Sequence, residues 1–331
     1  MQSAIKSRIY WLVEHKPTLK RSGFVALYQK ELADHFHSGR FKLLFGLLLL
    51  TSLASLFGAM ESISDSMTSS SEFIFLSVFT ASGNSIPSFA SFLAYLAPLV
   101  GLTLGFDAIN KERTQGTLNR LVSQPIHRDA IINAKFLAGT SVIALMILFI
   151  GGLIGGYALM LLGIPPSGEE IARIVSYLLF TVVYTALWLA LAMLCSILCR
   201  HAATSALIVI SIWIFLTLFA SMIVTIIADI AYPLEGIEGY FNMMSNYELQ
   251  QNLNRISPYY LYCEAASTLL NPNVRTVGIT TQASYSGAIA SYLSFDQSVL
   301  LIWPHLTCML ALTMAAFTIS YICFMRQEIR S

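Results

Sequence analysis

The chain has 331 residues, of which 56% are hydrophobic and only 11% are charged, and its mean hydropathy is +0.68. A soluble domain has about 25% charged residues, so this composition predicts an all-α integral membrane protein. The net charge of +1 gives no basic field for binding nucleic acid, and the five scattered cysteines predict neither a disulfide framework nor a metal site.

Residues 1–40 form a polar and basic segment without the apolar core of a cleavable signal peptide. Apolar and aromatic side chains recur at helical spacing in its second half: Phe24, Leu27, Tyr28, Leu32 and His35. We therefore expect a cytoplasmic tail that contains an amphipathic elbow helix lying along the membrane surface.

Six apolar runs follow, and about 20 apolar residues are needed to cross a bilayer core of about 30 Å. The runs cover residues 45–60, 89–106, 136–163, 174–198, 203–228 and 299–325. They predict a domain of six transmembrane helices within residues 41–325, followed by a short tail at 326–331. The apolar stretch at 73–80 is too short to cross alone, and we expect an interfacial or re-entrant piece there.

Lysine and arginine are distributed unevenly among the segments between these runs. Sixteen of the nineteen lie in residues 1–42, in 110–135, at Arg200 and in 326–331. Because cytoplasmic segments are enriched in these residues, both termini and residues 110–135 are expected in the cytoplasm. Residues 231–297 then form one long external segment between spans five and six.

The predicted spans contain almost no ionisable groups. His305 in the sixth run is the exception, and we expect it to form a hydrogen bond with a neighbouring helix. A proton-coupled carrier or a selective channel would need charged groups near the bilayer midplane, so both are disfavoured. The sequence also lacks HExxH, GxSxG and the phosphate-binding loop GxxxxGK[ST], which argues against an enzyme and against ATP binding by that loop.

Residues 110–135 are the most informative polar segment. Glu112 and Arg113 lead into a short helix that would end at Pro125. Its apolar side chains share one face, which could fill a groove on a partner: Leu118, Leu121 and Val122. Since both ends of the segment continue into spans two and three, a displacement of this helix by a partner could be transmitted to both spans. A solvated loop that only follows the charge rule is the alternative.

Glycines mark close helix packing in two of the spans. Span three contains overlapping GxxxG frames, formed by Gly151, Gly152, Gly155 and Gly156. Span two adds Gly101 and Gly105 at the same spacing. We expect packing within the chain, while contact between two chains stays open.

Three segments together resemble the permeases of type-2 ABC exporters. The strongest is Lys111-Glu-Arg-Thr-Gln-Gly-Thr-Leu-Asn-Arg-Leu-Val-Ser-Gln-Pro125, which is similar to the coupling helix of that family. Residues 27–40 resemble the family's elbow helix, and residues 257–270 resemble the stretch before its last span. The likeness extends over essentially the whole chain.

The resemblance implies a transport subunit in a prokaryotic cytoplasmic membrane, paired with a second permease chain, identical or homologous. A separate ATP-binding cassette ATPase subunit would bind the ATP, so no cofactor is expected here. The residues expected to couple to it are Glu112, Arg113, Gly116, Thr117, Leu118 and Leu121. The long external segment allows an accessory protein as a further partner. A non-transporting scaffold that recruits an external protein is the competing interpretation.

Overall fold

The computed structural model describes residues 23–66, 73–83, 86–117, 127–163, 165–274 and 292–327. Within these ranges the regular structure is helical and contains no strand. Six helical segments of the described chain are long and apolar enough to cross a membrane: Gly39–Met60, Phe89–Thr114, Arg128–Leu162, Gly168–Leu198, Ala202–Ala231 and Phe295–Arg326. The prediction of an all-α membrane protein with six spans is confirmed.

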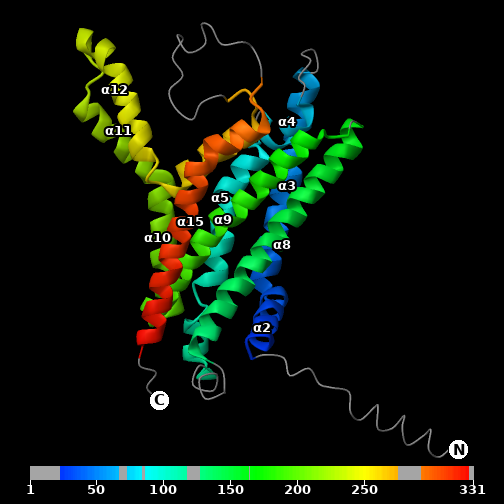
Figure 1. Cartoon of the computed structure of the whole chain (residues 1–331), viewed down its shortest axis with the longest axis vertical. Coiled ribbons are helices and arrows are strands. Elements are labelled where there is room, and N and C mark those ends of the chain that lie inside the picture. The colour runs from blue at the N-terminus through cyan, green and yellow to red at the C-terminus, as the bar shows by residue number, and fades with distance from the viewer. Residues whose placement is uncertain are drawn as a thin grey trace, which may run out of the picture.

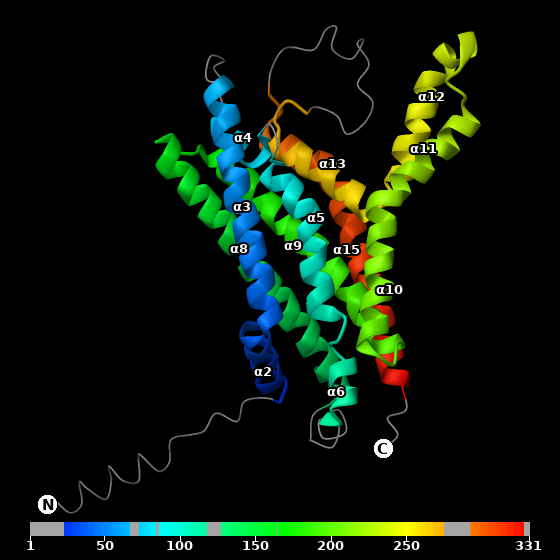
Figure 2. The ribbon, with the colours of Figure 1, turned by 180° about the vertical axis from the view of Figure 1, so that it is seen from behind.

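Helix α9 (Gly168–Leu198) forms the centre of the bundle (Figures 1 and 2). It packs against α5 (Phe89–Gly105), α8 (Arg128–Leu162) and α15 (Phe295–Arg326). Of its most apolar stretch 72% is buried, against 17% for the span Ala202–Ala231. Span four is therefore held by protein, whereas most of span five is left for lipid or another chain to cover.

Two glycines allow a close contact between α5 and α9. A methyl group on Gly101 would collide with the carbonyl oxygen of Thr185 and would lie 2.9 Å from the nitrogen of Leu189. A methyl group on Gly105 would lie 2.7 Å from Cβ of Ala192. Because backbone atoms stand in the way at Gly101, the two helices could accommodate a side chain there only by moving apart.

We expect Gly101→Ala to lower the stability of the chain and Gly156→Ala to leave it unchanged or raise it. A Cβ on Gly156 has no heavy atom within 4 Å, so the substitution there gains helix propensity, up to about 1 kcal/mol, without a collision. Unfolding of the two variants by sodium dodecyl sulfate in mixed micelles would compare them. Equal stabilities would contradict the tight α5–α9 contact.

One end of the bundle, which we call the α6 end, gathers α2 (Gly23–His37), α6 (Asn110–Thr114) and the last turns of α15 (Figure 2). Helix α2 packs along α8, where the Tyr28 hydroxyl donates to Oγ of Ser141 at 2.9 Å. Helix α3 (Gly39–Ser66) begins after a break at Ser38. A helix is thus present in the part of the tail where one was predicted, and it packs against span three.

The opposite end, the α13 end, carries the described residues of the long segment after span five. Span five itself is interrupted: α10 (Ala202–Ile214) passes into a π-helix, η1 (Phe215–Phe219), before α11 (Ala220–Ala231). Helix α12 (Gly236–Asn254) then runs beside α11, and α13 (Pro258–Leu270) lies across α9 and α15 (Figures 1 and 2). The seven-residue α4 (Ile74–Thr80), too short to cross, packs against α3 and α5 at this end.

Hydrogen bonds from polar side chains hold α13 against the spans around it. The Ser257 hydroxyl donates to the carbonyl of Leu216 in η1 at 2.7 Å. Nε2 of His305 lies 2.7 Å from Oε2 of Glu264, so this histidine does meet a neighbouring helix. The Arg173 guanidinium, which is fully buried, joins α9 to both α13 and α15. Helix α13, between spans five and six, is therefore held against the bundle by polar contacts.

Candidate coupling site

Helix α6 continues from span two through one tight turn. The backbone N–H groups of Ile109 and Asn110 both donate to Oγ of Ser196 in α9, at 3.1 and 3.2 Å. Gly116 follows the helix with a φ of +67° and with no atom within 4 Å of where a Cβ would stand. Only its backbone conformation, which ends the helix, calls for glycine there.

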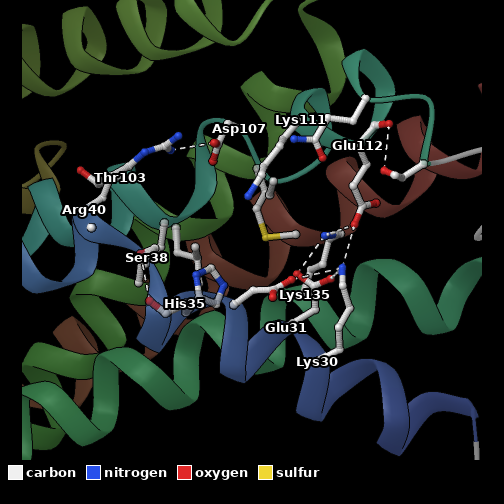
Figure 3. A pocket seen from close by; sticks show the side chains of 18 residues that line it. Lys30, Glu31, His35, Ser38, Arg40, Thr103, Asp107, Lys111, Glu112 and Lys135 are labelled. Atoms are coloured by element: carbon white, nitrogen blue, oxygen red, sulfur yellow. Dashed lines mark hydrogen bonds and ion pairs between the residues drawn. The ribbon is translucent and has the colours of Figure 1, made fainter.

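Glu112 is buried and points back into the chain (Figure 3). Its Oε1 lies 2.8 Å from Nζ of Lys135 in α8 and 3.6 Å from Nζ of Lys30 in α2. Lys135 is 3.0 Å from Oε2 of Glu31, and Lys30 is 2.9 Å from Oε1 of the same carboxylate. We call Lys30, Glu31, Glu112 and Lys135 the α2–α6–α8 network, because it ties these three helices together by charge.

Two carboxylates and two ammonium groups neutralise each other in this network. Burial by itself would raise the pKa of Glu31, but Lys135 and Lys30 more than offset it and hold that pKa below the usual value. Burial would likewise lower the pKa of Lys30, but Glu31, Glu112 and Asp34 together raise it. Both groups are therefore charged at neutral pH, and each stabilises the folded chain only while it stays charged.

We expect acid to weaken the network. A carboxyl group whose pKa is lowered by folding stabilises the chain above its unfolded-state pKa, about 4.3 for glutamate, and this contribution is lost as the pH falls further. The unfolding midpoint measured from pH 7 down to pH 3 should therefore fall more steeply for the native chain than for Glu31→Gln. Asp34→Asn, at an exposed position on the same helix, should keep the native slope. Parallel curves for the native chain and Glu31→Gln would contradict this.

Arg113 extends to the opposite side of α6. One guanidinium nitrogen donates to the carbonyl of Cys199 at the end of α9 (3.3 Å), and the other donates to Oε1 of Gln327 at the end of α15 (2.6 Å). Gln327 in turn donates to the carbonyl of Ile197 at 2.7 Å. Two consecutive residues of α6 thus connect it to α2 and α8 on one side and to α9 and α15 on the other.

The residues expected to couple to a partner are only partly gathered here. Glu112 and Arg113 lie at the centre of these contacts, and the Thr117 hydroxyl donates to the carbonyl of Glu112 at 3.3 Å. Leu118 and Leu121 lie outside the described residues. The sequence alone did not predict the partners of Glu112, although Lys135 gave a signal, because it is the last charged residue before the apolar run at 136–163.

The four glycines singled out in span three have unequal surroundings. A Cβ on Gly151 would collide with the side chain of Leu178 in α9, and one on Gly155 would only touch Phe75 at 4.0 Å. Gly152 and Gly156 have open space within 4 Å. Within the described chain, only Gly151 of this set approaches a neighbouring helix closely.

A cavity of about 600 Å³ lies beside the network (Figure 3). Side chains from α2, α3, α5, α6, α8 and α9 line it. At its far side Arg40 pairs with Oδ2 of Asp107 at 2.6 Å, and its guanidinium lies over the ring of Phe106. The cavity is therefore bordered by ion pairs whose residues come from three of the spans and from α2.

Comparison with known proteins places this architecture in a family. The sequence profile described as "ABC-2 family transporter protein" matches residues 25–329. The "Probable ABC transporter permease protein NosY" of Pseudomonas aeruginosa is 36% identical over 91 residues, which is 28% of this chain and 32% of that protein. The protein of the same name from Stutzerimonas stutzeri is 39% identical over 70 residues, 21% of this chain and 25% of the relative.

These alignments cover about a third or less of the curated relatives, so they identify shared segments and no common substrate. The profile match, by contrast, covers nearly the whole chain and includes most of α2, all of α6 and all six spans. The chain therefore belongs to the ABC-2 transporter family and is a multi-pass membrane permease of an ABC transporter.

Proposed function

We propose that this permease is the membrane subunit of an exporter that works as a pair of permease chains, each driven by a separate ATPase subunit. The α2–α6–α8 network carries the proposal. The ion pair between Glu112 and Lys135, at 2.8 Å, joins α6 directly to the base of span three. Because Glu31 shares Lys135, a displacement of α6 by an ATPase would be passed to α2 and α8 together.

The network changes the role expected for Glu112. Since this side chain is buried against Lys135 within the same chain, it does not form the docking surface for an ATPase. We infer that Glu112 positions α6, and that the surface offered to the ATPase includes exposed residues such as Thr114 and Gln115 together with the coupling residues that follow. Glu112 is then a positioning residue whose loss uncouples the subunits without preventing their association.

The orientation that suits this role places the α6 end in the cytoplasm, where ATP is available. The distribution of basic residues favours it, because Lys30, Arg40, Lys111 and Arg113 all lie at that end. The sequence contains no Gly-Lys dipeptide and hence no phosphate-binding loop of that type, so ATP would be hydrolysed by the partner.

The uncharged spans favour an amphiphilic or apolar cargo. A small hydrated ion would need charged groups or a ring of exposed carbonyls to replace its water, whereas His305 is the ionisable exception in the six apolar runs. Its Nε2 already meets Glu264 at the α13 end. Stimulation of ATP hydrolysis by lipids, lipopeptides and hydrophobic drugs, compared with metal ions, would separate the two classes of cargo.

The decisive experiment purifies the permease in mild detergent from cells of its source and identifies the proteins that accompany it. We expect an ATPase with a phosphate-binding loop, whose activity in reconstituted membranes responds to cargo. Glu112→Gln should retain the ATPase subunit but lose most of that response, while Asp34→Asn at an exposed position should keep it. Recovery of an external protein without any ATPase would favour the scaffold instead.

Orientation is tested by labelling single cysteines in a variant that lacks the native ones. Met243→Cys, at an exposed position of α12, should react with an impermeant reagent in intact cells. Gln115→Cys, exposed after α6, should react only once the cells are permeabilised. The reverse pattern would overturn the cytoplasmic placement of the α6 end.

A further inference from the structure

We propose that the cavity at the α6 end is a binding site for a phospholipid, with the phosphate of its headgroup held by Lys111 and Arg40. The site lies within one chain and does not require an ATPase or a second permease. Its volume of about 600 Å³ falls in the range of small-molecule sites, about 300–1,000 Å³. It is large enough for a headgroup and the first part of an acyl chain.

The level of the cavity in the membrane points to a headgroup. Arg40 precedes the apolar run of α3, Asp107 follows that of α5, and Lys135 precedes that of α8. These three charges line one cavity, so three spans reach the edge of the hydrocarbon core at the same height. Phospholipid phosphates lie at this boundary, and charged side chains there avoid the cost of the bilayer interior.

Charge within the cavity favours a phosphate. Lys111 is exposed, extends toward the middle of the cavity, and forms no ion pair with any residue that the structure describes (Figure 3). Arg40 is half exposed, and among the described residues it forms an ion pair with one carboxylate, that of Asp107. The lining carboxylates are all paired: Glu31 and Glu112 are buried against Lys135, Asp107 pairs with Arg40, and the exposed Asp34 pairs with Lys30 at 3.4 Å. Among the described lining residues, Lys111 is therefore the lysine or arginine whose charge is left for a ligand. An ammonium and a guanidinium with free donors are the groups that bind phosphate.

The lining also accommodates an acyl chain. Leu104 of α5 and Leu189 and Met193 of α9 contribute apolar surface to the same cavity. Thr103 stands beside them, and its hydroxyl is already satisfied by the carbonyl of Leu99 at 2.7 Å. Charged and apolar side chains lie next to each other in this cavity, as an amphiphile requires. A free anion would leave the apolar side chains in contact with water.

The test measures binding to the purified permease alone. The chain, stripped of lipid in detergent, is titrated with phosphatidylethanolamine and with phosphatidylglycerol, and bound lipid is counted by native mass spectrometry. Parallel arms contain glycerophosphoethanolamine and inorganic phosphate, which carry the phosphate without acyl chains. We expect one retained phospholipid per chain and no retention of either soluble phosphate at the same concentration.

Two variants and their matched controls locate the site. Lys111→Ala should weaken binding about tenfold or more, as expected for loss of a hydrogen bond to a charged group, whereas Lys42→Ala, outside the cavity, should not. Thr103→Phe should block the cavity, whereas Thr51→Phe should not. Thr51 forms the same kind of bond, to Leu47 at 3.0 Å, and does not line the cavity.

Monodisperse elution and a native unfolding midpoint would show that each variant is folded. Equal lipid binding by Lys111→Ala, Thr103→Phe and the native chain would overturn the proposal. Tight binding of a soluble phosphate would replace the lipid with a free anion. Neither measurement involves the ATPase. Failure of the lipid proposal would therefore leave the proposed transport function intact, and failure of the transport function would leave the lipid site intact.

Discussion

Replacing Lys135 by methionine should be among the most damaging single changes at the α6 end. The lysine side chain is only 6% exposed, and it separates two carboxylates, Glu31 and Glu112, that are each 8% exposed. Without it, Lys30 would remain as the one described cation near both. Removing one partner of a buried ion pair costs about 3–5 kcal/mol, and here a single half-exposed ammonium would be left to neutralise two buried carboxylates.

A double-mutant cycle would separate this electrostatic effect from a loss of packing. Lys135→Met and Glu112→Gln are made singly and together, and their free energies of unfolding are compared in mixed micelles. Because the double variant no longer buries an unpaired carboxylate on α6, it should be more stable than the sum of the two single changes predicts. Lys42→Met, on an exposed position of α3, controls for the loss of a lysine. Strict additivity would show that the two groups do not interact.

The spans were predictable because a bilayer imposes a simple requirement on composition. An apolar run of sufficient length must form a helix, and residues 174–198 or 299–325 could be identified without any knowledge of their neighbours. Hydropathy does not show where a helix is interrupted within such a run or which residues contact it. The π-helix η1 within span five and the bond that its Leu216 carbonyl accepts from Ser257 are not indicated by any periodicity of the run.

The site was predictable in its location but not in its contacts. Glu112 stood out because a polar segment with helix signals joined two spans, and the N-terminal helix was apparent from its apolar spacing. Pairing Lys135 with Glu31 requires the register of α2 against α8, across a sequence separation of 104 residues. That register is set by packing, for example by Tyr28 on Ser141, and it cannot be obtained from either helix alone.

Arg173 illustrates the same difficulty at the α13 end. In the sequence it counts as one of three basic residues that depart from the charge asymmetry. In the structure it is fully buried and donates to Glu169, to the carbonyls of Leu269 and Leu293, and to the hydroxyl of Ser298. A buried guanidinium with this many acceptors is a structural centre that joins α9, α13 and α15.

Arg173→Met should therefore cost about 3–5 kcal/mol of stability, because hydrogen bonds to a charged donor contribute about 1.5–3 kcal/mol each and two backbone carbonyls would be left without it. Arg173→Lys should recover only part of this loss, since one ammonium cannot span acceptors on three helices as the planar guanidinium does. Arg326→Met, at an exposed position of α15, should change stability by less than about 0.5 kcal/mol.

A local readout distinguishes a specific loosening of α13 from general unfolding. In Arg173→Met the backbone amides of α13 should exchange hydrogen faster, because the carbonyl of Leu269 near its end loses the guanidinium donor. Amides of α5 near Gly101, which pack tightly on α9 far from this end, should keep their native protection. Uniformly faster exchange along the whole chain would indicate that Arg173 supports the fold in general and does not specifically hold α13 against α9.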